Sequence, residues 1–183
     1  LLTPQSAREL VSLLSKNISI PIHVHSHATA GLASLNLIAA VEAGATIIDT
    51  CNSSFSEGAS HPTTESIIAA LQSMGYEINI DIASIESISE HLREVRKKYW
   101  QFESEFTGVD PRVLSNQVPG GMISNLSNQL KDQDALNKMD DVLKEIPEVR
   151  KDLGYPPLVT PTSQIVGTQA ALNIITGSRY KTV

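Results

Sequence analysis

A run of alternating residues near the start of the chain, with histidines at His23, His25 and His27, constrains the fold more than any other feature. Its flanking residues favour a loop, so the run is typical of a short strand that ends in a loop. Residues two apart in a strand point to the same side, which puts the three imidazoles on one face and Ile22 and Val24 on the other. Two neutral imidazoles at such spacing can hold one divalent metal ion. The alternative is a strand whose histidines are buried and hydrogen-bonded to carbonyl groups.

The composition is that of a globular protein with one domain. A length of 183 residues is enough to bury a sizeable core. The net charge of -6 argues against nucleic acid or an anionic membrane as the main partner. No apolar run approaches the roughly 18 residues of a membrane span, and the polar first turn does not resemble a signal peptide. The single Cys51 has no internal disulfide partner, so we expect a cytoplasmic protein.

Helical and strand patterns alternate along the chain as far as Gly75. Alternation of this size is typical of half an α/β barrel or of part of a doubly wound sheet. In both folds, functional residues gather at the carboxyl ends of the strands, where His25, His27 and the loop over residues 51–61 are expected to lie. The expected elements are a helix capped by Thr3 with Pro4 at its first position, a strand over 20–27, a helix over 32–43, a strand over 45–50 and a helix after Pro62.

From Ile82 onward the pattern becomes helical and charged. We expect the aromatic residues that follow the first helix of this region to anchor it by packing, and its basic residues to form a solvated side or a partner surface. The apolar stripe is Ile85, Ile88, Leu92, Val95 and Tyr99, the anchor residues are Trp100, Phe102 and Phe106, and the basic residues are Arg93, Arg96, Lys97 and Lys98.

The remaining pattern predicts three further elements. A tight turn over 118–122 precedes a helix over 123–130, and a second apolar stripe begins at Val142 and is bent or restarted by Pro147. An extended segment then leads into a final helix over 164–176.

Five segments, in order along the whole chain, carry a resemblance to a known family. They are PIHVHSHAT (21–29), HPTTE (61–65), VRKKY (95–99), QVPGGM (117–122) and VTPTSQIVGT (159–168). Together they resemble the carboxyltransferase family of biotin-dependent enzymes, which includes the oxaloacetate decarboxylase alpha subunit, the transcarboxylase 5S subunit and pyruvate carboxylase. The histidine run alone is shared with other metal-dependent aldolase-like barrels.

The resemblance implies a fold and a metal site. The fold class is α/β: the last strands of a (β/α)8 TIM barrel, incomplete in this chain, over residues 1–80, followed by a mostly helical extension over residues 81–183. The family's divalent metal, usually zinc with cobalt or manganese as alternatives, is held by an Asp, a carboxylated Lys and two His. The two His match His25 and His27, and His23 is then a neighbour and not a ligand.

The loop after the second strand resembles the region that admits biotin, with Ser56, Gly58, Ala59 and Ser60 as candidate residues. The family's pyruvate carboxylases place a Thr, implicated in proton transfer with biotin, where this chain has Ala59. Ser60, His61 and Thr63 are the candidate catalytic residues in its place, although each can simply shape the loop.

The first residues align just after the family's metal Lys, so we expect this chain to be a fragment that lacks six strands and the other two metal ligands. Metal binding at His25 and His27 should then be weak or need ligands from another chain. We expect the partner that brings biotin to be a carrier domain separate from residues 1–183.

Ala28 stands where pyruvate carboxylases generally have Asp. Together with the segment SHPTTE (60–65), it makes the chain more similar to oxaloacetate decarboxylase alpha subunits and to B subunits of split pyruvate carboxylases, and we expect an enzyme of the oxaloacetate decarboxylase type. It would move a carboxyl group between oxaloacetate or pyruvate and biotin, together with other subunits and as a homo-oligomer. The alternatives are the B subunit of a split pyruvate carboxylase, transcarboxylase 5S, an aldolase-like lyase that does not use biotin, and a non-catalytic piece with an assembly role.

Overall fold

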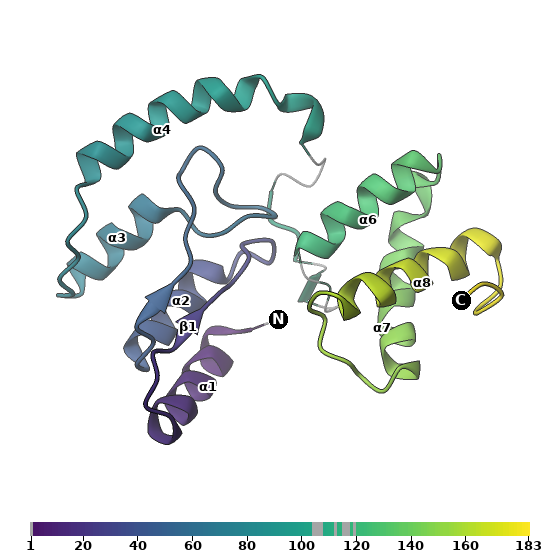
Figure 1. Ribbon diagram of the computed structural model, residues 1–183, viewed down its shortest axis with the longest axis horizontal. Helices are drawn as coiled ribbons and strands as arrows, with labels where there is room; N and C mark the ends of the chain where they lie inside the picture. Colours follow the sequence, from purple (N-terminus) through teal and green to yellow (C-terminus); the bar gives the residue numbers. More distant parts are fainter. Residues whose placement is uncertain (1, 104–107, 112, 115–117, 119) are drawn as a thin grey trace. The chain divides into compact units, whose positions relative to one another are not determined.

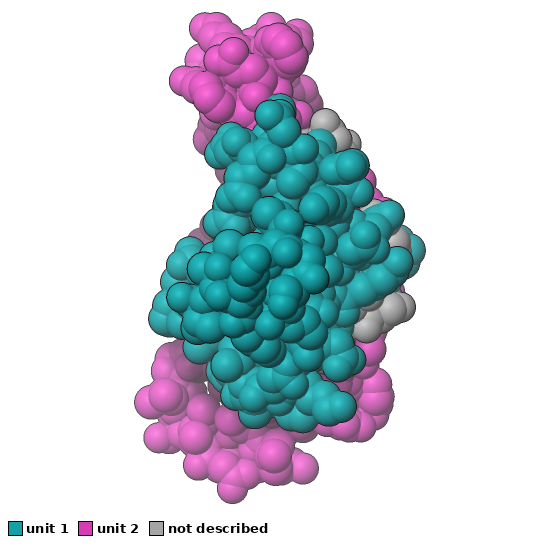
Figure 2. Space-filling view, turned by 90° about the vertical axis from the view of Figure 1, so that its right-hand side faces the viewer, with its two compact units in different colours: residues 1, 111–183 teal, residues 2–110 magenta. Residues whose placement is uncertain are grey.

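The computed structural model describes residues 2–103, 108–111, 113–114, 118 and 120–183. Contacts within the chain divide it into two compact units, residues 2–110 and 111–183 (Figure 2). The expected boundary between residues 80 and 81 follows the family's fold and not contacts, and it stays a prediction.

Two short strands of the first unit pair in parallel, as the sequence predicts. Strand β1 (His23–Val24) lies beside β2 (Ile47–Ile48), with His23 opposite Ile47 and Val24 opposite Ile48. Both strands are shorter than expected, because regular pairing stops where the chain turns into the loops that follow them. Beyond β2, Cys51 forms a parallel bridge with Thr63, which brings the start of the next helix to the same edge. This arrangement is that of a partial barrel.

Helices α1 (Pro4–Asn17) and α2 (Ala33–Glu42) cover one face of these strands (Figure 1). The expected cap of α1 is confirmed, since the Thr3 side chain accepts a hydrogen bond from the backbone N–H of Ser6. Gly44 follows α2 with a φ of 110°, a conformation that side chains rarely adopt. The buried core of this unit is Val11, Ile22, Val24, Leu37, Ala40 and Ala45.

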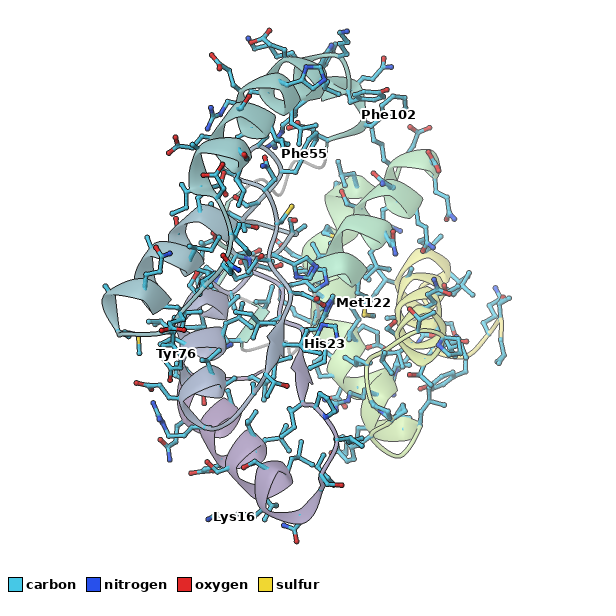
Figure 3. The ribbon with its side chains drawn as sticks, turned by 60° about the vertical axis from the view of Figure 1, so that its left-hand side comes forward. Lys16, His23, Phe55, Tyr76, Phe102 and Met122 are labelled. Carbon is cyan, nitrogen blue, oxygen red and sulfur yellow. The ribbon has the colours of Figure 1, made fainter. Side chains whose placement is uncertain are left out.

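Helix α3 (Thr64–Ser73) is followed by α4 (Ile82–Lys97) and by the short helix η1 (Trp100–Phe102). The expectation that aromatic residues anchor α4 is wrong for the two of them that the structure describes. Trp100 is 74% exposed and Phe102 is 72% exposed, and Figure 3 labels Phe102 at the end of this segment. Phe106 lies outside the described residues. The residues of the apolar stripe are partly buried or exposed. The buried residue of α4 is the polar Ser89.

The second unit is helical, as expected for the extension. It contains α6 (Gly120–Asp132), η2 (Leu136–Lys138), α7 (Met139–Asp152) and α8 (Thr162–Thr176) (Figure 1). Glycine at 167 allows α6 and α8 to approach closely, since a Cβ there would lie 2.8 Å from Cε of Met122. Helix α7 continues through Pro147 and buries Val142 and its neighbours.

One expectation about this unit is wrong. Gly120, Gly121 and Met122 are the first residues of α6 and not a turn that precedes it, while Gln117 and Pro119 lie outside the described residues. Each described helix is too short or too polar to cross a membrane.

Ser89 is the one buried residue of α4 and connects that helix to the loop after β2. It is 1% exposed. Its hydroxyl accepts a hydrogen bond from the Asn52 amide at 2.8 Å and donates to the Glu65 carboxylate at 2.7 Å. Its carbonyl oxygen accepts a hydrogen bond from Ser54 Oγ at 2.6 Å. A single serine therefore holds α3, α4 and the loop together.

We expect Ser89→Ala to lower the free energy of unfolding of the chain by about 1–2 kcal/mol, because the Asn52 amide loses a buried partner. Urea unfolding followed by circular dichroism measures this. Ser87→Ala, at an exposed position of the same helix, is the matched control and should leave stability within about 0.5 kcal/mol. Equal effects of the two substitutions would contradict the role given to Ser89.

Glu65 predicts a pH dependence of stability. Burial raises the pKa of Glu65, but hydrogen bonds from Ser53 and Ser89 outweigh this and hold it below its ordinary value of 4.5. A lowered folded-state pKa stabilises the folded chain above the unfolded-state pKa, and this contribution is lost as the pH falls through the folded-state value. The stability difference between the chain and Glu65→Gln should therefore be constant near neutral pH and shrink on acidification below 4.5. A pH series of urea unfolding curves, with Glu86→Gln as the control, tests it, and a difference that grows in acid would contradict it.

Candidate functional site

The parallel pairing of β1 and β2 brings the residues that follow each strand to the same edge. Asp49 comes directly after β2 and accepts two hydrogen bonds there, from Nε2 of His23 and from Nδ1 of His25, both at 2.7 Å. Figure 3 labels His23, the first residue of β1. One carboxylate therefore orients the first two histidines of the run.

Three imidazoles gather next to this carboxylate, but they are not the three of the histidine run. His25 and His27 are joined by His61, which comes from the loop after β2. The ring centroids are 5.1 Å apart for His25 and His27, 4.4 Å for His25 and His61, and 4.6 Å for His27 and His61. One ligand atom from each ring lies within 4.8 Å of the other two. His23 is outside this group, in keeping with its expected role as a neighbour.

The second nitrogen of each clustered ring is held by an oxygen. Nδ1 of His25 donates to Asp49, Nδ1 of His27 donates to the Ala59 carbonyl at 2.5 Å, and Nδ1 of His61 donates to the Ser26 carbonyl at 3.0 Å. In a neutral imidazole, a proton on Nδ1 leaves Nε2 with an exposed lone pair. These three bonds therefore prepare three Nε2 atoms as metal ligands, and metal-binding histidines are typically held in this way.

The two interpretations of the histidine run that the sequence left open are thus compatible. His27 does bond to a backbone carbonyl, but through Nδ1, so its Nε2 stays available as a ligand atom. An imidazole has two nitrogens, so a carbonyl partner on one of them orients the other.

Backbone and side-chain hydrogen bonds join segment 26–29 to segment 58–61. The Ala28 N–H donates to the Ser60 carbonyl at 2.8 Å and the buried Thr29 hydroxyl donates to the Gly58 carbonyl at 3.0 Å. The bonds that His27 and His61 make to carbonyls run between the same two segments. We refer to these four bonds as the loop clasp. The clasp holds the loop that carries His61 against the loop that carries His27.

Two groups of the centre, His27 and Asp49, have a pKa that departs from the ordinary value. Burial is the main cause that lowers the pKa of His27, the bond to the Ala59 carbonyl raises it, and the nearby His61 and His25 lower it further. Hydrogen bonds from His25 and His23 lower the pKa of Asp49. At neutral pH the centre therefore combines a neutral His27 with an ionised Asp49. Neutral imidazole nitrogens suit a divalent transition metal such as zinc or cobalt.

The remaining candidates of the loop occupy different positions. The Thr63 hydroxyl donates to the Glu57 carboxylate at 3.1 Å and lies 2.7 Å from Ser56 Oγ. Gly58, Ala59 and Ser60 contribute carbonyl oxygens to the loop clasp. Of the three catalytic candidates, His61 lies in the imidazole cluster, Ser60 adjoins it and Thr63 is tied to another part of the loop.

Sequence reasoning missed the role of Asp49. The signal was present, because Asp49 ends the second apolar strand and the carboxyl ends of parallel strands meet at one edge. It also missed the place of His61 beside His25 and His27, for which the sequence offers no signal of comparable strength.

Comparisons with known proteins identify the family and the fold of the chain. A family model described as HMGL-like matches residues 1–92, and a model described as a conserved carboxylase domain matches residues 113–183. The carboxyl transferase domain of Rhizobium etli pyruvate carboxylase, solved with pyruvate, superposes with a TM-score of 0.92 at 31% identity, covering 98% of this chain and 30% of that one. The fold is therefore that of the last part of a carboxyltransferase TIM barrel with its helical extension.

Curated relatives specify the family further. The pyruvate carboxylase B subunit of Methanocaldococcus jannaschii is 53% identical over 184 residues, which cover 100% of this chain and 32% of that protein. The methylmalonyl-CoA carboxyltransferase 5S subunit of Propionibacterium freudenreichii is 44% identical, covering 99% of this chain and 36% of the relative. The chain belongs to the carboxyltransferase family of biotin-dependent enzymes. It spans about a third of the length of these relatives.

Asp49→Ala should weaken zinc binding by the chain about 10–100-fold, since His25 loses the acceptor that orients it. Competition with a chromophoric chelator measures the affinity, and the far-UV circular dichroism spectrum checks folding. Glu77→Ala, at an exposed acidic position, should leave the affinity unchanged. If Asp49→Ala binds zinc as tightly as the unchanged chain, Asp49 does not support the site.

Proposed function

We propose that this chain forms the metal-binding part of a carboxyltransferase that moves a carboxyl group between a 2-oxo acid and biotin. The observation that carries the proposal is the imidazole cluster at the carboxyl ends of two parallel strands, in a chain of the biotin-dependent carboxyltransferase family. His25 and His27 are the proposed metal ligands, as the resemblance implies. His23 shares Asp49 with His25 and helps to position that carboxylate.

The residues of the site have separable tasks in this proposal. A bound divalent metal would polarise the keto and carboxylate oxygens of the 2-oxo acid. Asp49 keeps Nδ1 of His25 protonated, so that Nε2 stays a ligand atom. The Ala59 carbonyl does the same for His27, so position 59 acts here through its backbone. The methyl side chain of Ala59 has no proton to transfer, and the Ser60 hydroxyl is the proposed candidate for that step.

The names of the relatives favour a pyruvate carboxylase B subunit over the oxaloacetate decarboxylase alpha subunit that we expected from the sequence. Two relatives are named as B subunits of pyruvate carboxylase, which is one of the alternatives from the sequence. A third, 44% identical over 90% of this chain, is the 2-oxoglutarate carboxylase large subunit of Hydrogenobacter thermophilus. We therefore propose pyruvate and oxaloacetate as the substrate pair, a separate biotin carrier domain as the partner, and a homo-oligomeric assembly with other subunits of a biotin enzyme.

A segment exchange tests this proposal. The segment of the Methanocaldococcus jannaschii protein that aligns with this chain over 184 residues is replaced by this chain. Release of pyruvate from oxaloacetate, stimulated by free biotin, is followed with lactate dehydrogenase and corrected for spontaneous decarboxylation. We expect the exchanged protein to be active and the isolated chain to be nearly inactive, because catalysis needs metal, 2-oxo acid and biotin held in one pocket.

In the exchanged protein, His25→Ala should abolish activity, His23→Ala should reduce it less, and His91→Ala on the exposed side of α4 should have no effect. Parallel assays with 2-oxoglutarate distinguish the two acceptor classes. An inactive exchanged protein that folds and binds metal, or a fully active isolated chain, would overturn the proposal.

A further inference from the structure

We infer that His61 supplies a third metal ligand through Nε2, so that this chain holds a divalent transition metal with its own residues alone. This inference deepens the proposed function, because it concerns the same centre. The family resemblance assigns only His25 and His27 to the metal, and from those two residues weak binding is expected. Three imidazoles equal the number of protein ligands in a typical catalytic zinc site and leave one position open for a substrate oxygen.

The position of His61 supports this role. Its ring lies closer to both proposed ligands than they lie to each other, with centroid distances of 4.4 and 4.6 Å against 5.1 Å. Tetrahedral zinc with bonds of about 2.0–2.1 Å separates its nitrogen ligands by about 3.3 Å. The three ligand atoms lie within 4.8 Å of one another, which is about 1.5 Å more than that spacing.

The surroundings of His61 hold the ring in the required orientation. Nδ1 donates to the Ser26 carbonyl at 3.0 Å, which leaves Nε2 as the nitrogen available to a metal. The next residue is the fully buried Pro62, whose ring restricts the backbone. The Ala28 N–H bond to the Ser60 carbonyl fixes the residue before it. The loop clasp therefore presents His61 as a preformed ligand.

An alternative role for His61 is to close the loop through its bond to Ser26 and nothing more. His61→Gln separates the two roles, because the glutamine amide can still donate to the Ser26 carbonyl but offers no imidazole nitrogen. His61→Ala removes both functions. His91→Ala, at an exposed position of α4, is the matched control for loss of a histidine.

The experiment titrates the isolated metal-free chain with Co²⁺, followed by visible absorption, and with Zn²⁺ in competition with a chelator. We expect one ion per chain with the intense visible bands of four-coordinate cobalt. His61→Gln and His61→Ala should each lose more than about 100-fold in affinity, which exceeds the effect of residues that only support a ligand. His91→Ala should bind like the unchanged chain. An unchanged affinity in His61→Gln overturns the inference.

Nitrogen-15 NMR of the histidine rings gives a readout that does not depend on activity or on the stability of a variant. Zn²⁺ should shift the Nε2 signals of His25, His27 and His61 together and leave His91 unchanged. A shift confined to His25 and His27 would show that His61 is not a ligand. If the segment-exchanged enzyme is inactive but all three signals shift, the proposed function fails and this inference stands. If that enzyme is active and His61→Gln in the isolated chain binds Zn²⁺ with unchanged affinity, this inference alone fails.

Discussion

The parallel pairing of β1 with β2 is the constraint on which the rest of the site depends. Placing Val24 opposite Ile48 makes the next residue on each strand, His25 and Asp49, meet at the carboxyl edge. A register shifted by one residue would turn the carboxylate to the other face and leave His25 without its acceptor. The core of α1 and α2 fixes that register, because Val24 and Ile22 are buried against Leu37 and its neighbours.

Backbone carbonyl groups do much of the orienting work in this centre. His27 and His61 are each held by a carbonyl oxygen of the opposite loop, whereas His25 is held by a carboxylate. A carbonyl partner is independent of the side chain at that position. The loop can therefore orient His27 with Ala59 in place of the Thr that the resemblance assigns to pyruvate carboxylases. The side chains of Ser56 and Thr63 serve the loop itself, through bonds to each other and to Glu57.

The parts that the sequence predicts correctly are those that depend on local patterns. The cap at Thr3, the alternation of helix and strand, and the parallel strands follow from spacing and turn chemistry, and the meeting of His25 and His27 follows from the period of a strand. The position of His61 depends on hydrogen bonds between segments about 30 residues apart, and carbonyl partners leave no trace in the identity of the residues that provide them. The sequence does place Asp49 at the end of an apolar strand, but its bonds to His23 and His25 depend on the register of that strand against β1.

The helix over 82–97 shows a different limit. Its apolar spacing correctly predicts an amphipathic helix, but spacing does not say what covers the apolar side. In the described part of the chain the buried contact of α4 is made by Ser89, through hydrogen bonds, while Trp100 and Phe102 remain exposed. Apolar patterning thus identifies a surface that can be buried, but it does not identify the element that covers it.

The loop clasp couples the closing of the two loops to the assembly of the imidazole cluster. Two of its four bonds come from the cluster imidazoles themselves, so separating the loops also separates His27 from His61. With about 1 kcal/mol for each bond, such an opening costs on the order of 4 kcal/mol and is populated roughly once in a thousand. A metal ion bound by both rings would oppose that opening, because it would join the two loops directly.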